Sequence, residues 1–264
     1  MATAALVENR VHPVHPRARK RQDWTCSAGV DVGPYGRAVV TVSELQAQVV
    51  SRFERLSPPS WVAPRPPGAA PREEEYSRVT DPERYRVVHS RARVWAAVLE
   101  DELGAHVEAL SPGSIARDGR PQPFDRGVRL TPRQPGALAL LLLERDVPWH
   151  EADATMAVLD IGVGDPGTLV ASLPDCGCDA CDSGSRDLLD AIDSMIRQVV
   201  GGPFVVLQGR TWHAQWYPDG GSAGGEGHGP DFRAVMELCR HLAQGETVRL
   251  PRHTESLVGR SWLS

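Results

Sequence analysis

The fold of this chain is most constrained by the alternation of short apolar runs with amphipathic stretches between residues 76 and 250. Runs of four to eight residues between turn residues are typical of strands, and single helices between them favour an α+β fold. Because several runs are joined by short links, we expect a mainly antiparallel sheet with packed helices. The predicted strands are Val107–Leu110, Val128–Thr131, Ala137–Leu143, Met156–Val163, Thr168–Leu173, Phe204–Leu207, Thr211–Tyr217 and Thr247–Leu250. The run 156–163 is almost entirely apolar, which predicts a central strand.

Three helices are expected to pack on this sheet. The first follows Thr80-Asp81-Pro82-Glu83, a capping-box pattern, and ends at Gly104. Trp95 lies within its apolar stripe, so we predict that it is a core residue. The second helix starts near Ser183 or Ser185 and ends at 201–203, and the third runs from Pro230 to Gly245.

The sequence divides into five parts by composition. Its first segment is basic and lacks periodicity, which predicts disorder. A second interpretation is that the translation start has been assigned upstream of the natural one. Ser43-Glu44-Leu45-Gln46 fits a capping box for a short helix, and six prolines between Pro58 and Pro71 indicate a stiff linker. The predicted organisation is a disordered tail (1–42), a helix (43–56), a proline-rich linker (57–75), the α+β domain (76–250) and a C-terminal tail (251–264).

Charge and lysine content exclude several classes of protein. The net charge of −5 argues against a nucleic-acid partner for the main domain. Lys20, in the basic tail, is the only lysine among 29 basic residues. The folded part therefore has no Schiff-base lysine and no phosphate-binding loop of the GxxxxGK[ST] type.

Cysteine usage and hydropathy indicate a soluble, cytoplasmic protein. The five cysteines are an odd number with three of them crowded together, unlike a secreted disulfide framework. No apolar core of a signal peptide lies near the N-terminus, and the longest apolar run, 137–143, is too short to span a bilayer.

The cysteine cluster at residues 175–182 is the strongest candidate for chemistry. Cys176, Cys178 and Cys181 supply three soft ligands, and Gly177 lets the backbone bend around an ion. A structural zinc ion needs four ligands. The fourth would come from Asp175, Asp179, Asp182 or a distant residue such as His213.

Two other interpretations of the cluster stay open. Cys178 and Cys181 form a CxxC ahead of a helix, where the dipole lowers a thiol pKa, so a thiol oxidoreductase is one alternative. The neighbouring aspartates disfavour a thiolate but attract a cation, which favours a metal. The third interpretation is a turn of inert thiols in a protein-interaction module with no metal, which would use a sheet face or the glycine-rich loop 219–229.

Several segments resemble a known family. Tyr76 to Tyr85, the run CGCDACDSG at 176–184 and the terminal Gly259-Arg260-Ser261-Trp262-Leu263 are similar to an actinobacterial family of unknown function, DUF6226. The resemblance covers residues 43–264 and implies a cytoplasmic bacterial protein, but it carries over no activity.

No complete catalytic signature is present: GxSxG is absent, and His150-Glu151 lacks the second histidine of HExxH. The sequence therefore favours a non-enzymatic protein with a small structural zinc site over a catalyst.

Overall fold

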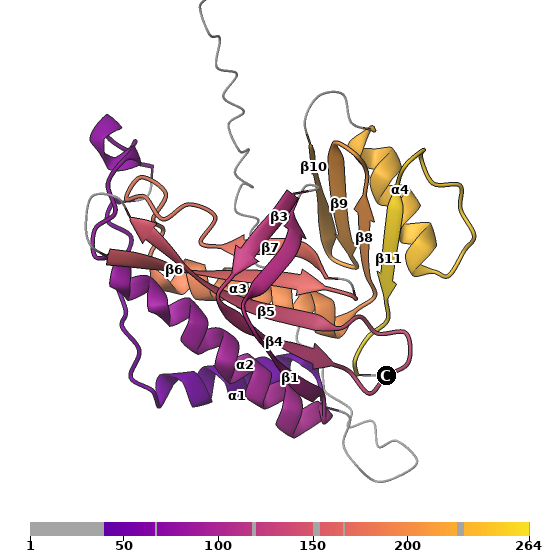
Figure 1. Ribbon diagram of the computed structural model, residues 1–264, viewed down its shortest axis with the longest axis horizontal. Helices are drawn as coiled ribbons and strands as arrows, with labels where there is room; N and C mark the ends of the chain where they lie inside the picture. Colours follow the sequence, from indigo (N-terminus) through magenta and orange to yellow (C-terminus); the bar gives the residue numbers. More distant parts are fainter. Residues whose placement is uncertain are drawn as a thin grey trace, which may run out of the picture. The chain divides into compact units, whose positions relative to one another are not determined.

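The computed structural model describes residues 40–66, 68–117, 120–149, 154–165, 167–225 and 230–263. Residues 40–264 form one compact unit, to which the following description applies. Most of the tail predicted over residues 1–42 and the end of the glycine-rich loop, 226–229, lie outside the described residues. The unit has an α+β fold with two mainly antiparallel sheets, as the apolar runs predicted (Figure 1).

The first helix, α1, spans Val42–Glu54 and starts one residue earlier than predicted. Its N-cap is Thr41, whose side chain accepts a hydrogen bond from the Glu44 backbone N–H, while Glu44 accepts one from the Thr41 backbone. The capping box is therefore Thr41 with Glu44, not the predicted Ser43 with Gln46. One face of α1 is buried through Leu45, Val49 and Phe53.

The proline-rich segment that follows is attached to the domain along its length. It includes a short 3-10 helix, Glu73–Tyr76, and a bridge between Val62 and Gly184. Trp61 also packs against the main core. The sequence predicted an extended linker. In the structure this segment also contacts residues that are distant in the sequence, such as Gly184.

A second 3-10 helix, Pro82–Arg86, leads into α2, Val87–Leu103. This helix ends at Gly104, whose φ of 61° lies in the left-handed region that glycine adopts readily. Trp95 is fully buried in it, which confirms the expected core position. The predicted helix thus exists, with its first turn in the tighter 3-10 form.

The larger sheet has seven strands in the order β1-β4-β5-β6-β7-β2-β3. All its pairings are antiparallel except a single parallel bridge between β2 and β7. Its strands are β1 (His106–Leu110), β2 (Gly113–Arg117), β3 (Arg120–Phe124), β4 (Arg126–Thr131), β5 (Leu140–Trp149), β6 (Ala154–Val163) and β7 (Thr168–Leu173). The predicted central strand, β6, is fourth of the seven; β2 and β3 were not predicted.

The smaller sheet has four strands in the order β10-β9-β8-β11. Its elements follow α3 (Ser185–Gly201) and are β8 (Phe204–Gln208), β9 (Trp212–Tyr217), β10 (Gly220–Gly225), α4 (Phe232–Ala243) and β11 (Glu255–Gly259). The β8–β9 hairpin confirms the predicted one.

Three predictions for this part of the chain differ from the structure. The glycine-rich loop was expected to be irregular, but its residues 220–225 pair with β9 as an edge strand. No strand forms at 247–250, and the last strand is β11, inside the segment predicted as a tail. Strand β11 pairs along β8, and Trp262 beyond it is buried. The pairing of β11 with β8 joins residues about 50 positions apart, so the local sequence pattern does not reveal it.

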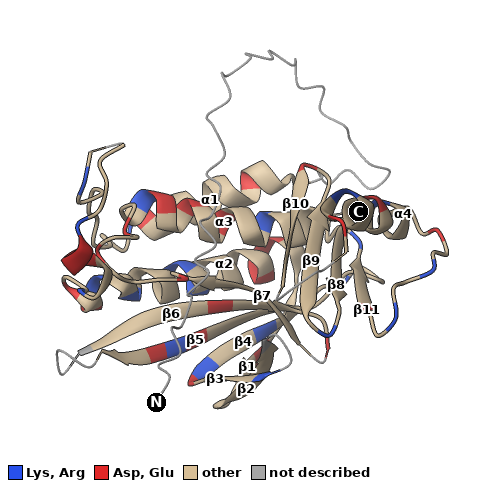
Figure 2. Cartoon of the chain, turned by 90° about the horizontal axis from the view of Figure 1, so that it is seen from above, with Lys and Arg blue, Asp and Glu red and all other residues tan. Residues whose placement is uncertain are grey.

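The main core lies between the seven-stranded sheet and the helices α1, α2 and α3, which cover one of its faces (Figure 2). A smaller core lies between α4 and the four-stranded sheet, around Val205, Leu207, Val235 and Cys239. None of the helices in the described ranges is long and apolar enough to cross a membrane.

A buried ion pair joins the three helices of the main core. Asp193 of α3 accepts hydrogen bonds from Arg91 Nε and Nη2 at 2.9 and 2.5 Å and from Trp95 Nε1 at 2.7 Å. Gln46 of α1 donates to the same carboxylate at 3.3 Å. Both charged side chains are almost fully buried, at 5% and 2% exposure for Arg91 and Asp193. The carboxylate therefore fixes how α1, α2 and α3 pack.

Candidate metal centre: the cysteine loop

The segment 174–184 joins β7 to α3, and we call it the cysteine loop. The Sγ atoms of Cys176, Cys178 and Cys181 all lie within 4.8 Å of one another. The sulfurs of Cys176 and Cys178 are 3.2 Å apart. Cys178 is buried, whereas Cys176 and Cys181 are exposed. The structure thus brings the three predicted thiols together at one point.

Asp179 is turned away from solvent and ties the loop to the segment before α2. Its carboxylate accepts hydrogen bonds from Arg78 Nε at 2.5 Å and from the Thr80 backbone N–H and hydroxyl, both at 2.7 Å. Burial acts to raise the pKa of Asp179, but the donors from Arg78 and Thr80 outweigh it, so the pKa is lowered. The carboxylate is therefore ionised and engaged in holding the loop.

Asp182 plays a similar part at the other end of the loop. It accepts hydrogen bonds from Trp61 Nε1 at 3.0 and 3.1 Å, from Arg84 Nη2 at 2.6 Å and from the Gly184 backbone N–H at 2.8 Å. The Arg84 guanidinium also lies 4.9 Å from the centre of the Trp61 ring. Asp182 therefore joins the proline-rich segment and the 3-10 helix Pro82–Arg86 to the start of α3.

Backbone groups of the loop are also held by the segment 65–78. The Asp179 N–H donates to the Arg78 carbonyl at 2.8 Å, and the Ala180 N–H donates to the Glu75 carbonyl at 3.1 Å. Arg65 donates to the carbonyls of Asp179 and Ala180 and pairs with Glu75 at 3.0 Å. With its polar backbone satisfied in this way, the loop has a defined shape before any ion binds.

Gly177 is required by close packing under the loop. A Cβ atom at this position would lie 1.8 Å from Met156 Sδ, so a larger residue would require the Met156 side chain or the loop to shift. The Gly177 carbonyl also accepts a hydrogen bond from the buried Tyr85 hydroxyl at 3.3 Å. The glycine was predicted to allow a bend; the structure assigns it to a close approach instead.

The pKa values of the thiols determine whether the cluster can act as a nucleophile. Burial, together with interactions with the neighbouring thiols, raises the pKa of Cys181 to about 12. Burial also raises the pKa of Cys176. Thiols of this kind are largely protonated at neutral pH and are poor nucleophiles, but a bound metal ion would remove their protons.

The candidate fourth ligands differ in their surroundings. Asp175 is exposed, and its Oδ1 accepts a hydrogen bond from the Cys176 backbone N–H at 2.8 Å. His213 lies on β9 and lines a small polar cavity of about 130 Å³ with Ser172 and Gln215. Among the described residues, the cluster of potential ligand atoms consists of the three thiols alone.

The sequence alone missed the groups that hold the loop. Arg78, Arg84 and Trp61 lie about a hundred residues before the carboxylates they contact, so no local pattern joins them. It also missed Asp193. A signal for that residue existed, because an acidic residue at 193 falls beside Leu189 and Ile196 on the apolar face of α3.

Fold and loop together define an α+β protein with a three-thiol loop between a strand and a helix. The chain belongs to a family of unknown function, DUF6226, whose family model matches residues 47–264. The match confirms the resemblance seen in the sequence. No match was found among the curated proteins or among the solved structures.

Proposed function

We propose that the cysteine loop binds a single zinc ion through the thiolates of Cys176, Cys178 and Cys181. The observation that carries this proposal is the convergence of three sulfurs within 4.8 Å on a loop held by other contacts. Zinc–sulfur bonds of about 2.3 Å in a tetrahedral site place the sulfurs about 3.8 Å apart. The separations in the loop, 3.2 Å between Cys176 and Cys178 and no more than 4.8 Å for any pair, lie on either side of that value.

The fourth coordination position is proposed to belong to Asp175 or to water. Asp179 and Asp182 each accept hydrogen bonds from an arginine and from backbone N–H groups, and ligation would sacrifice those contacts. Asp175 is exposed and has only a local hydrogen bond to give up. A water ligand fits the exposure of Cys176 and Cys181 equally well.

The proposed role of the ion is structural. The loop connects β7 to α3 and also touches the segments 61–65 and 75–85, so an ion would fix a junction of four chain segments. Metal binding at such a junction adds directly to folding free energy. A cytoplasmic location, where thiols stay reduced, belongs to the same proposal.

Thiol redox chemistry is the second candidate, favoured by one contact. The sulfurs of Cys176 and Cys178 are 3.2 Å apart, so these two thiols are in contact. The raised pKa values of Cys176 and Cys181 weigh against an attacking thiolate. A metal-free interaction module is the remaining alternative.

The decisive experiment is elemental analysis of full-length protein purified without added zinc. One equivalent is expected, and Cys178→Ser should lose it and lower the melting temperature. Cys239→Ser is the matched control, because Cys239 is buried in α4 outside the cluster. It should keep the metal even if it is less stable.

Thiol titration separates the alternatives. If the metal proposal holds, the loop thiols react only after a chelator is added. A rapidly reacting thiol in metal-free native protein would favour redox chemistry. If the thiols react slowly whether or not a chelator is added, and no metal is bound, both the metal and the redox interpretations are wrong.

A further inference from the structure

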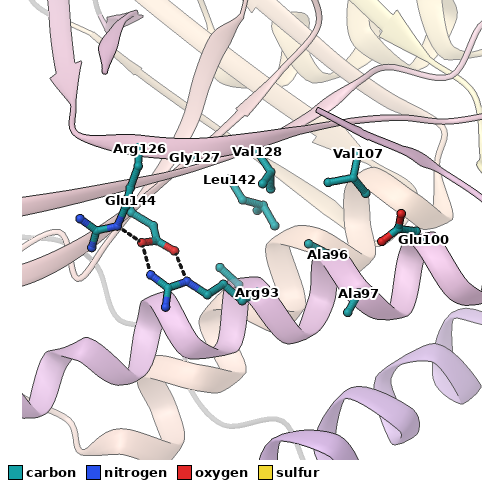
Figure 3. A pocket seen from close by; sticks show the side chains of 11 residues that line it. Arg93, Ala96, Ala97, Glu100, Val107, Arg126, Gly127, Val128, Leu142 and Glu144 are labelled. Atoms are coloured by element: carbon teal, nitrogen blue, oxygen red, sulfur yellow. Dashed lines mark hydrogen bonds and ion pairs between the residues drawn. The ribbon is translucent and has the colours of Figure 1, made fainter. Parts of the chain in front are cut away.

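A second hollow lies far from the cysteine loop in the chain, between α2 and the strands β1, β4 and β5. Its volume is about 400 Å³, within the range of small-molecule sites. Ala96, Val107, Val128 and Leu142 form its apolar surface, as Figure 3 shows. Neither the family nor the proposed zinc site accounts for it.

Charged side chains mark one end of this cavity. Glu144, of which only 7% of the side chain is exposed, accepts hydrogen bonds from Arg93 Nε and Nη2 at 2.7 and 2.5 Å and from Arg126 Nε at 2.5 Å (Figure 3). The buried carboxylate thereby holds two guanidinium groups side by side at the cavity edge. The three groups together carry a net charge of about +1.

The two arginines are not equally free. Arg126 also pairs with Asp146 at 3.0 Å and lies 3.5 Å from His89 Nδ1. Arg93, whose side chain is 62% exposed, contacts only Glu144 among the described residues, and its Nη1 has no acceptor there. Arg93 is therefore the better placed to bind a ligand group.

Glu100 stands at the opposite end of the apolar surface, about two helical turns from Arg93 on the same face of α2 (Figure 3). It is exposed and has no ion-pair partner among the described residues. A second negative charge on a ligand would approach this carboxylate and be repelled. The charges of Arg93 and Arg126 are balanced by those of Glu144 and Asp146, so this end of the cavity offers the unpaired N–H donors of Arg93 and carries no net charge. The middle of the cavity is apolar, and the Glu100 end disfavours anions.

We propose that this cavity binds a small monocarboxylic acid with an apolar body, such as a medium-chain fatty acid. The carboxylate is received by the Arg93 guanidinium beside Arg126, and the chain lies over Ala96, Val128 and Leu142. Glu144 occupies the Nε and Nη2 side of Arg93, which leaves Nη1 and the second N–H of Nη2 to receive the ligand carboxylate. Burial of the chain supplies apolar contact. This proposal is independent of the zinc site.

Binding of three probes of equal chain length to full-length protein tests it: decanoate, decanol and decanedioate, measured by calorimetry. Decanoate should bind one-to-one. Decanol should bind about tenfold more weakly because it lacks the charge-assisted hydrogen bond, a loss of about 1.4 kcal/mol. Decanedioate should also bind more weakly than decanoate. Equal affinity for decanoate and decanol, or no saturable binding of decanoate, would overturn the proposal.

Variants locate the binding. Arg93→Gln should weaken decanoate about tenfold and leave decanol unchanged. The matched control is Arg86→Gln, since Arg86 is a half-exposed arginine that pairs with Glu83 outside the cavity. It should change neither. Ala97→Trp, which enlarges an exposed residue of the lining, should weaken both probes. Unaltered decanoate binding in Ala97→Trp would place the ligand elsewhere and refute the assignment.

Discussion

The interior of the helical layer and the cysteine loop both depend on buried carboxylates, but they use them differently. Asp193 of α3 accepts hydrogen bonds from side chains of two other helices, α1 and α2, and joins elements that are already formed. Asp179 and Asp182 accept donors from backbone as well as side chains, and they define the shape of a loop. The first arrangement fixes packing, whereas the second fixes a backbone that would otherwise have no regular structure.

This difference changes how acidic residues beside cysteines are interpreted. Three aspartates interleaved with three thiols suggest a cation site by composition alone. In the structure two of the three form ion pairs with arginines and hold the loop, so their carboxylates are engaged in shaping it. Acidity near a thiol cluster is therefore weak support for carboxylate ligands.

The largest effect is expected at the helix junction. Asp193→Ala should lower the free energy of unfolding by about 3–5 kcal/mol, because it leaves the buried Arg91 without a partner. Urea unfolding measures this, with Asp190→Ala as a control on the same helix, where the residue is exposed. A loss below about 1 kcal/mol would show that Arg91 finds other solvation, and the junction would not depend on the ion pair.

Trp95→Ala is expected to cost nearly as much, about 3–5 kcal/mol, through the loss of a fully buried ring. Because Trp95 Nε1 donates to Asp193, the two substitutions should not be additive. The double variant should therefore lose less stability than the sum of the single ones. Strict additivity would mean that the Trp95 ring and Asp193 contribute to stability independently.

The cysteine loop should be more tolerant. Asp179→Ala should lower the free energy of unfolding by about 2–3 kcal/mol, because it removes a charged acceptor and leaves the Thr80 N–H unpaired. Asp175→Ala is the control in the same loop, where the exposed carboxylate predicts a loss below about 0.5 kcal/mol. Equal losses at the two positions would contradict the distinction between holding and exposed aspartates. Both variants should be compared in metal-free protein.

The helices and the central strands could be predicted because their signals are local. The stripe that contains Trp95 repeats at helical spacing, and β6 is mostly apolar, with Asp160 as its charged residue. Strand β3 escaped prediction because Pro121 and Pro123 interrupt it, and β10 because it is rich in glycine. Strand β10 forms because its backbone pairs with β9, although its own residues have a low preference for strands.

The candidate site was predictable only in its sulfurs. Cys176, Cys178 and Cys181 are close in sequence, so any tight loop brings their side chains together. The roles of Asp179 and Asp182 depend on residues about a hundred positions earlier, which no spacing rule reaches. The cavity beside Arg93 likewise arises from contacts between a helix and three strands.

The pH dependence of stability tests a further buried side chain, His89, which has no strong ion pair. The Nε2–H of His89 donates to the Val158 carbonyl at 2.9 Å, and the ring faces Glu144 at 3.7 Å and Arg126 at 3.5 Å, with Asp146 beyond. Burial is the main cause that lowers the pKa of His89 below its ordinary value of 6.5.

The unfolded chain therefore binds this proton more readily than the native protein does. Stability is complete above pH 6.5 and should fall as the pH drops below it towards the lowered pKa, by at most about 1.4 kcal/mol per pH unit. His89→Gln should flatten this part of the pH profile. His241→Gln, at an exposed histidine paired with Glu246, serves as the control and should not. An unchanged slope in His89→Gln would mean that Glu144 keeps the ring charged.

The smallest effects concern the start of α1, the helix that supplies Gln46 to the Asp193 junction. Thr41→Ala should cost about 1 kcal/mol because Thr41 caps the helix, and Ser43→Ala should cost almost nothing.

Removing residues 1–39 should leave the melting temperature unchanged, since that segment lacks the periodicity of a core element. Removing residues 1–42 should cost as much as Thr41→Ala, because the cap is then lost. Thermal unfolding of the four variants separates these cases. A drop of several degrees on removing 1–39 would show that the N-terminal segment packs on the domain and supports the helix junction from outside.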